Sequence, residues 1–190
     1  MKKARQIEIP KDRPLTIDEF VDFRNHAYNS SLWYASEYTR SERQITEKLL
    51  NKGYIEEDVE YLDKNGKPHS FNIIDFVLSE LREGLVVDDE AYARGLIRRY
   101  SEGKRGVRYI SQKLFSKGID SDLTARLLEE LSDDEEMLEA MDYLAKRFQN
   151  TSAYLRIEND FLRRQKLSNH FASRGYSYDD ISLWESTQED

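Results

Sequence analysis

The chain has 190 residues, of which 38% are hydrophobic, 35% are charged and none is cysteine. Without cysteine the chain can form no disulfide scaffold, thiol nucleophile, zinc ribbon or iron–sulfur site. No apolar run reaches the roughly 18 residues that span a bilayer, and residues 1–13 lack the apolar stretch of a signal peptide, so we expect neither a membrane helix nor export. A charged fraction well above the usual quarter leaves a thin core, which suits an elongated array of helices better than a compact sphere.

The formal net charge of −8 argues against a protein that coats itself in nucleic acid, but the charge is unevenly distributed. Residues 94–117 carry a charge of +7, with Glu102 as the only acid, and the remainder of the chain carries −15. This asymmetry indicates an anionic partner, although a solvated helix face produces the same pattern. The basic residues of this window are Arg94, Arg98, Arg99, Lys104, Arg105, Arg108, Lys113 and Lys117.

The predicted elements begin after a basic arm, residues 1–15, which we expect to be disordered. All three prolines fall within the first 68 residues, and apolar residues recur at helical spacing through much of the chain. Capping-box patterns mark three helix starts, at Thr16-x-x-Glu19, Ser41-x-x-Gln44 and Ser132-x-x-Glu135. We predict helices at 17–39, 41–52 and 55–82, then at 88–102, 106–117 and 120–131, and finally at 133–149, 155–174 and 177–185.

Residues 61–70 interrupt the third predicted helix with a polar stretch. Its Asn65-Gly66 pair favours a tight turn, so we predict an insertion here in the form of a small hairpin. The last predicted helix is followed by an acidic tail, residues 186–190.

An internal repeat emerges when three segments are aligned on the glycines that end them, Gly53, Gly118 and Gly175. In each segment apolar residues stand eight and four positions before the glycine, a cation stands one before it, and an apolar residue follows. A left-handed glycine would end each helix, and the cations Lys52, Lys117 and Arg174 would first serve the negative end of the helix dipole. The sequence thus predicts an all-α, elongated and curved array of three tandem three-helix repeats, at residues 16–87, 88–131 and 132–185, which stack because each is too small to fold alone.

Catalytic and metal-binding patterns are not convincing in this sequence. The histidines, His26, His69 and His170, lack metal-ligand spacing, and His170 occupies a repeat position where the other copies carry lysine, so we expect it on a helix surface. The acidic pairs Asp88-Asp89 and Asp133-Asp134 stand where helix starts favour negative charge. Most of the aromatic residues lie on apolar stripes, so we expect them to pack in the core rather than to stack on bases. We therefore predict no enzyme, no metal and no cofactor.

Several segments resemble the RecX regulatory proteins. Residues 41–54, with the pattern Ser-x-x-x-Ile-x-x-Lys-Leu-x-x-Lys-Gly-Tyr, are similar to the first repeat of that family. Residues 80–94 (Glu-Leu-Arg-Glu-Gly-Leu-Val-Val-Asp-Asp-Glu-Ala-Tyr-Ala-Arg) resemble its link into the second repeat, and residues 103–110 and 114–119 continue in the same style. The resemblance covers roughly residues 30–185.

This resemblance implies a cytoplasmic regulator of the RecA recombinase, active in DNA recombination, DNA repair and the SOS response. Members of the family consist of three three-helix repeats, bind the RecA–DNA filament in or against its groove, and inhibit ATP hydrolysis and strand exchange or block filament extension. We expect the chain to act as a monomer without a membrane, with its eight basic residues at 94–117 contacting the filament. Its acidic remainder should make binding to bare DNA weak.

Two other functions fit the same sequence. The short basic helix at 106–117 could belong to an autonomous helix-turn-helix regulator that binds DNA, although it offers few side chains that read bases. The repeats could also form a scaffold for protein–protein contacts with no DNA contact. Sequence-specific binding to DNA without RecA would favour the first of these, and RecA binding that ignores salt and DNA would favour the second.

Overall fold

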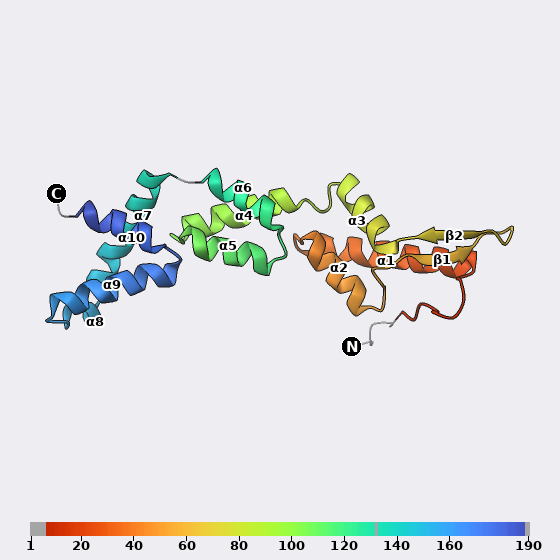
Figure 1. Ribbon diagram of the computed structural model, residues 1–190, viewed down its shortest axis with the longest axis horizontal. Coiled ribbons are helices and arrows are strands. Elements are labelled where there is room, and N and C mark those ends of the chain that lie inside the picture. The colour runs from red at the N-terminus through yellow and green to blue at the C-terminus, as the bar shows by residue number, and fades with distance from the viewer. Residues whose placement is uncertain (1–6, 132, 189–190) are drawn as a thin grey trace. The chain divides into compact units, whose positions relative to one another are not determined.

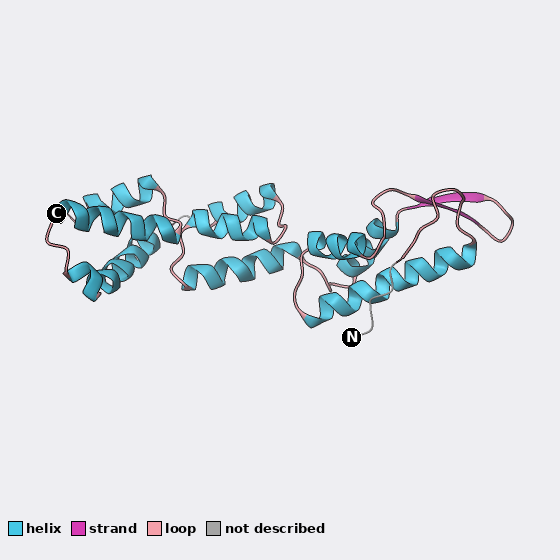
Figure 2. Ribbon diagram, turned by 90° about the horizontal axis from the view of Figure 1, so that it is seen from below, coloured by secondary structure: helices cyan, strands magenta, loops and turns pink. Residues whose placement is uncertain are grey.

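The computed structural model describes residues 7–131 and 133–188, which contain ten helices and one two-stranded sheet. The chain divides into two compact units, one ending at Tyr92 and one beginning at Ala93 (Figure 1). Figure 2 shows how small the sheet is beside the helices, and the predicted all-α fold of helical repeats is confirmed. The boundaries between the three repeats remain a prediction.

The first unit contains three helices and a hairpin. Its elements are α1 (Ile17–Glu37), α2 (Glu42–Asn51), β1 (Val59–Leu62), β2 (Pro68–Phe71) and α3 (Ile73–Glu83). Apolar side chains of α2 and α3, among them Ile45, Leu49, Val77 and Leu81, are fully shielded from solvent and form the centre of its core.

The second unit is entirely helical in the residues that are described. Helix α4 (Asp89–Glu102) begins in the first unit and continues into the second from Ala93. The helices that follow it are α5 (Val107–Ser116), α6 (Ser121–Glu129), α7 (Asp134–Gln149), α8 (Ser152–Leu155), α9 (Asp160–Arg174) and α10 (Tyr178–Ser186). Met141, Phe171 and Trp184 are buried together where α7, α9 and α10 meet.

The hairpin is confirmed, but the helix predicted at 55–82 is wrong over its first half. Strands β1 and β2 pair antiparallel from Val59 opposite Phe71 to Leu62 opposite Pro68, and Gly66 adopts a left-handed φ of 77° in the turn between them. The helix begins only after the hairpin, because the Asn72 side chain accepts the Asp75 N–H at 2.9 Å and caps α3.

The expectation of a disordered N-terminal arm is wrong for residues 7–15; residues 1–6 lie outside the described part. Ile7 is buried and donates its N–H to the Lys52 carbonyl at 2.8 Å. Leu15 is also buried and bonds with the edge of β1 through a parallel bridge to Tyr61. Although the segment is basic, its apolar residues Ile7 and Leu15 are buried in the core of the first unit, and their backbone groups form hydrogen bonds there.

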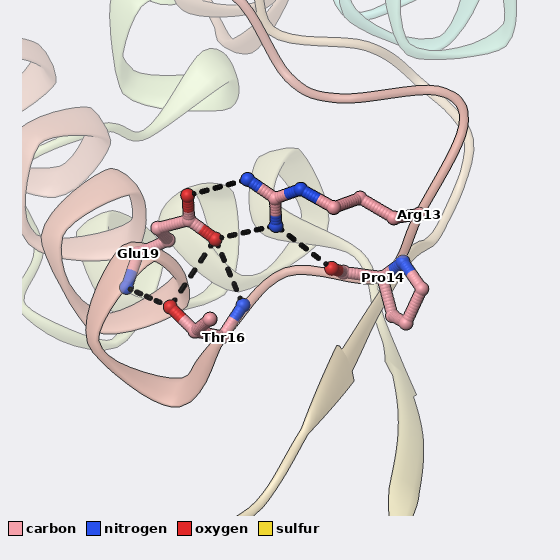
Figure 3. A network of polar contacts seen from close by, with 4 residues as sticks. All are labelled: Arg13, Pro14, Thr16 and Glu19. Atoms are coloured by element: carbon pink, nitrogen blue, oxygen red, sulfur yellow. Dashed lines mark hydrogen bonds and ion pairs between the residues drawn. The ribbon is translucent and has the colours of Figure 1, made fainter.

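The capping box predicted at Thr16 is confirmed and is joined by Arg13 (Figure 3). The Arg13 guanidinium donates to both Glu19 carboxylate oxygens, at 2.8 and 2.9 Å, and the Thr16 N–H donates to Glu19 Oε2 at 2.9 Å. Hydrogen bonds from Arg13 and from the Thr16 backbone stabilise the carboxylate and lower the pKa of Glu19 to about 2.

The helix-ending glycines behave as the repeat predicts, with left-handed φ angles of 98°, 82° and 96° at Gly53, Gly118 and Gly175. The residue after each glycine is buried and returns its N–H to the helix. These bonds join Tyr54 to the Leu49 carbonyl, Ile119 to the Leu114 carbonyl and Tyr176 to the Phe171 carbonyl, at 3.1–3.2 Å.

The starts of α7 and α9 differ from those that the sequence predicts. The helix predicted at 155–174 starts only at Asp160, as α9, because Asn159 accepts the Leu162 N–H and caps it. The short α8 ends at Leu155, where the predicted helix was expected to begin. The capping residue predicted at Ser132 lies outside the described residues. The structure shows Asp133 capping α7, with its carboxylate accepting the N–H groups of Glu135 and Glu136.

Candidate nucleic-acid interface

The link between α4 and α5 is held by backbone hydrogen bonds to the end of α9. The Gly106 N–H donates to the Arg174 carbonyl at 3.0 Å, and the Arg108 N–H donates to the Gly175 carbonyl at 3.1 Å. A Cβ atom on Gly106 would lie 2.5 Å from the Gly175 carbonyl, and one on Gly175 would lie 2.5 Å from Tyr109. Only glycine at both positions allows this approach, which gives the start of α5 a fixed support.

Two of the predicted contact residues lie over one aromatic ring at the start of α5. The Arg105 guanidinium carbon lies 4.4 Å from the centre of the Tyr109 ring, and Lys113 Nζ lies 5.2 Å from the same centre. Tyr100 of α4 packs edge-on against Tyr109. The ring therefore positions two cations close together by cation–π attraction.

The structure places the other predicted contact residues in different environments. On the exposed surfaces of α4 and α5 lie Arg98, Arg99 and Arg108. Arg94 forms an ion pair with Glu130, at 2.7 Å, so its guanidinium is shared with a carboxylate. Lys117 is half-buried at the C-terminal end of α5, in the capping place that the repeat predicts.

Lys104 has an unusual backbone conformation beside a cavity of about 380 Å³. Its φ of 54° is left-handed, which costs a non-glycine residue free energy, and its carbonyl faces the Tyr176 hydroxyl at 3.5 Å. Arg147 and Arg174 also line this cavity, so three cations converge there. The sequence analysis missed Arg147 because this residue lies far outside the basic window at 94–117.

His170 lies on α9, as expected, and lines the same cavity in a half-buried rather than fully exposed position. Its ring is half-buried and stacks on Phe148, with 4.3 Å between the ring centres. Burial lowers the pKa of His170, and the charge of Arg174 lowers it further. A neutral ring at this place leaves the charge of the cavity to Lys104, Arg147 and Arg174, with Glu102 as the acid beside them.

The remaining histidines have separate partners: His26 Nδ1 lies 2.8 Å from the Tyr54 hydroxyl, and His69 Nε2 lies 3.2 Å from Asp63. Within residues 7–131 and 133–188, no three His, Asp or Glu side chains are grouped so that they could hold a metal ion. No helix of these same segments is long and apolar enough to cross a membrane.

The repeat alignment reveals a second copy of the cation arrangement in the first unit. Counted from the helix-ending glycine, the cations Arg105, Lys113 and Lys117 stand 13, 5 and 1 positions before it, and Arg40, Lys48 and Lys52 stand at the same positions before Gly53. Arg40 and Lys48 also share one ring, since they lie 4.3 and 3.7 Å from the centre of Tyr34. Alignment on the glycines would have found this copy, which the charge count did not.

Comparison with known proteins agrees with the sequence resemblance. Residues 88–128 match the family model for the second three-helix domain of RecX, which includes the α4–α5 link described above. Over 185 residues, 95% of this chain, it is 28% identical to the regulatory protein RecX of Clostridioides difficile. A similar relation, 29% identity over 186 residues, links it to the regulatory protein RecX of Clostridium acetobutylicum. Over most of its length the chain is therefore similar to RecX regulatory proteins.

The relatives differ in length from this chain. The chain spans 75% of the C. difficile protein but only 56% of the regulatory protein RecX of Lactococcus lactis, to which it is 28% identical. The crystal structure of RecX from Lactobacillus salivarius matches the fold with a TM-score of 0.70 at 20% identity, covering 89% of this chain and 98% of that one. A second crystal structure of a regulatory protein RecX matches with a TM-score of 0.65 at 22% identity, over 94% and 83% of the two chains. These structures support the repeat fold of the RecX family.

Proposed function

We propose that this chain binds filaments of the RecA recombinase on DNA and lowers their ATPase and recombinase activity. The observation that carries the proposal is the pair of cations, Arg105 and Lys113, held over Tyr109 on a link whose backbone is fixed to α9. Similarity to relatives that are named regulatory proteins supports a regulatory role rather than an enzymatic one. The protein would act as a monomer in the bacterial cytoplasm.

The basic surface of α4 and α5 has the chemistry for contacts with phosphate groups. Its arginines and lysines neutralise phosphates without reading bases, so binding releases counterions and weakens as salt increases. The charge of −15 outside residues 94–117 opposes binding to bare DNA and complements basic surfaces of a protein partner. Binding to DNA that RecA presents should therefore be stronger than binding to bare DNA.

The proposed contacts follow from the environments of the basic residues. Arg94 and Lys117 contribute less than the others, because Arg94 is paired with Glu130 and Lys117 ends a helix. The main contacts with the filament are assigned to Arg98, Arg99, Lys104, Arg105, Arg108 and Lys113.

The experiment measures ATP hydrolysis by RecA on single-stranded DNA while the amount of this protein increases. We expect inhibition at or below one protein per RecA subunit, and we expect Arg105→Glu with Lys113→Glu to weaken it at least tenfold, because two contacts become repulsive. Lys64→Glu with Lys67→Glu is the matched control, since it makes the same change of charge in the exposed turn of the hairpin.

No inhibition at equal amounts of the two proteins would refute the proposal. Sequence-specific retardation of DNA without RecA would replace it with the autonomous helix-turn-helix regulator. Binding to RecA that is independent of both salt and DNA would replace it with a protein scaffold.

A further inference from the structure

The end of α1 carries an exposed aromatic cluster. Trp33, near the C-terminal end of α1, is 60% exposed, and Tyr38, the residue that ends this helix, is 68% exposed. Tyr34 lies between them in the chain and is half-buried. The expectation that aromatic residues serve the core holds for many of them, but it is wrong for Trp33 and Tyr38.

Two cations of the neighbouring segment lie over these rings. Lys48 Nζ of α2 is 3.7 Å from the centre of Tyr34 and 5.5 Å from that of Trp33. The Arg40 guanidinium carbon is 4.3 Å from the centre of Tyr34 and 5.3 Å from that of Tyr38. Cations and rings therefore form one continuous surface, which we call the α1–α2 platform.

The positive charge of the α1–α2 platform is not neutralised by a bonded carboxylate. Among the described residues, neither Arg40 nor Lys48 forms an ion pair, and Arg40 Nε is shielded from solvent without a hydrogen-bond partner. Burial lowers the pKa of Lys48, and the charges of Lys52 and Arg40 lower it further, against an opposing effect of Glu37. An anion placed beside these side chains would relieve that repulsion.

We propose that the α1–α2 platform binds single-stranded DNA, with bases stacked on Trp33 and Tyr38 and phosphates held by Arg40 and Lys48. Exposed aromatic rings interleaved with cations are the surface that single strands require, because their bases offer open faces and their backbones offer charge. Duplex DNA hides the base faces, so it fits this surface less well. The choice of DNA over RNA rests on the proposed function in RecA filaments, where DNA is the strand presented.

The repeat supplies a second argument for an anion at this place. Arg40 and Lys48 occupy the positions that Arg105 and Lys113 occupy before their own helix-ending glycine, and each pair lies over a tyrosine ring. The same arrangement of charge therefore recurs on two repeats, and exposed Trp33 and Tyr38 add base stacking to the first copy.

The chain contains its own reporter for this proposal. Of its two tryptophans, Trp33 is exposed, whereas Trp184 is buried and donates its indole N–H to Asp142 at 2.8 Å. A base stacked on Trp33 should quench its fluorescence and leave that of Trp184 unchanged. The experiment titrates the full chain with oligo(dT), with an abasic oligonucleotide of the same length, with oligo(rU) and with duplex DNA.

We expect oligo(dT) to quench the fluorescence and to bind about tenfold more tightly than the abasic strand and the duplex, because only oligo(dT) offers free bases. Labelled oligo(dT) followed by anisotropy should bind Trp33→Ala about tenfold more weakly, and Tyr38→Ala likewise, whereas Trp33→Phe should retain most of the affinity. Phe161→Ala is the matched control, because Phe161 is 71% exposed on α9 and no cation of the described segments lies over its ring.

Equal affinity for oligo(dT) and the abasic strand would overturn base stacking, and equal quenching by oligo(rU) would overturn the preference for DNA. Quenching by RecA filaments but not by DNA alone would mean that the platform contacts protein, which also overturns the proposal. The ATPase assay separates this proposal from the proposed function. Inhibition without oligo(dT) binding refutes only the platform, and oligo(dT) binding without inhibition refutes only the regulation of RecA.

Discussion

Helices α2 and α5 carry the same pair of cations in different surroundings, with one cation just before the helix and one in its last turn. Arg40 and Lys48 share one tyrosine ring in the first unit, and Arg105 and Lys113 share another in the second. At α5 the support is backbone, since Gly106 approaches the end of α9 too closely for any side chain. The carbonyl of Lys52, at the end of α2, is instead met by Ile7 of the N-terminal segment.

The larger difference lies in the side chains around each pair. Exposed arginines extend the positive surface of α4 and α5, whereas the exposed rings of Trp33 and Tyr38 flank the pair at α2. Under the two proposals, one repeat position would serve two kinds of contact. Phosphate neutralisation would depend on how many cations surround it, and base stacking would depend on which rings are exposed. The salt dependence of binding should distinguish the two kinds of contact, because base stacking releases few counterions whereas phosphate neutralisation releases many.

The largest expected effect comes from removing the support of α5. Gly175→Ala forces a side chain into a left-handed residue and places its Cβ 2.5 Å from Tyr109, so we expect the free energy of unfolding of the second unit to fall by about 3 kcal/mol. Denaturant unfolding followed by Trp184 fluorescence measures this loss. RecA inhibition should fall with it, while quenching of Trp33 by oligo(dT) should persist.

Gly66→Ala is the control for the backbone part of this effect. Gly66 is also left-handed, but a Cβ there meets nothing within 4 Å, so the expected loss is about 1 kcal/mol. Equal losses for the two variants would show that the contact between Gly175 and Tyr109 contributes nothing.

An effect of intermediate size distinguishes phosphate contacts from stacking. Filament affinity is measured over a range of salt concentrations for Arg105→Ala with Lys113→Ala and for Trp33→Ala with Tyr38→Ala. Removing two phosphate contacts should reduce the slope of log affinity against log salt by about two. The aromatic variant should weaken binding and leave the slope unchanged, and a similar slope in both variants would remove the distinction between the two surfaces.

The sequence predicts the repeats well because their ends depend on local backbone rules. A glycine preceded by a cation and followed by an apolar residue ends a helix by the same hydrogen bonds wherever it occurs, as Tyr54 and Tyr176 show. The α5 cations were also predictable, because they cluster in sequence as well as in space. The predicted filament contacts themselves remain predictions.

The features that the sequence did not predict depend on contacts between distant segments. Arg40 and Lys48 stand among glutamates, so the charge of their neighbourhood hides them until the two side chains are seen over one ring. The exposure of Trp33 depends on how the end of α1 packs on α2, and the apolar periodicity of the sequence does not specify that packing. Ile7 was assigned to a disordered arm because its apolar contacts lie about 45 residues away in the chain, around Lys52.

The smallest expected effect concerns the start of α1, which belongs to the first unit and touches neither pair of cations. The pKa of Glu19 falls from 4.5 to about 2 on folding, because Arg13 and the Thr16 N–H bind its charged form. A carboxyl group with a lowered pKa stabilises the folded state fully above pH 4.5 and loses that contribution as the pH falls toward 2. Glu19→Gln should therefore have a lower denaturant midpoint than the wild type at pH 7, and the difference should shrink steadily between pH 4.5 and 2. The change in denaturant midpoint should be confined to the first unit, which contains Glu19. A matching change in the midpoint followed by Trp184 fluorescence would contradict this, because it would mean that the two units do not unfold independently.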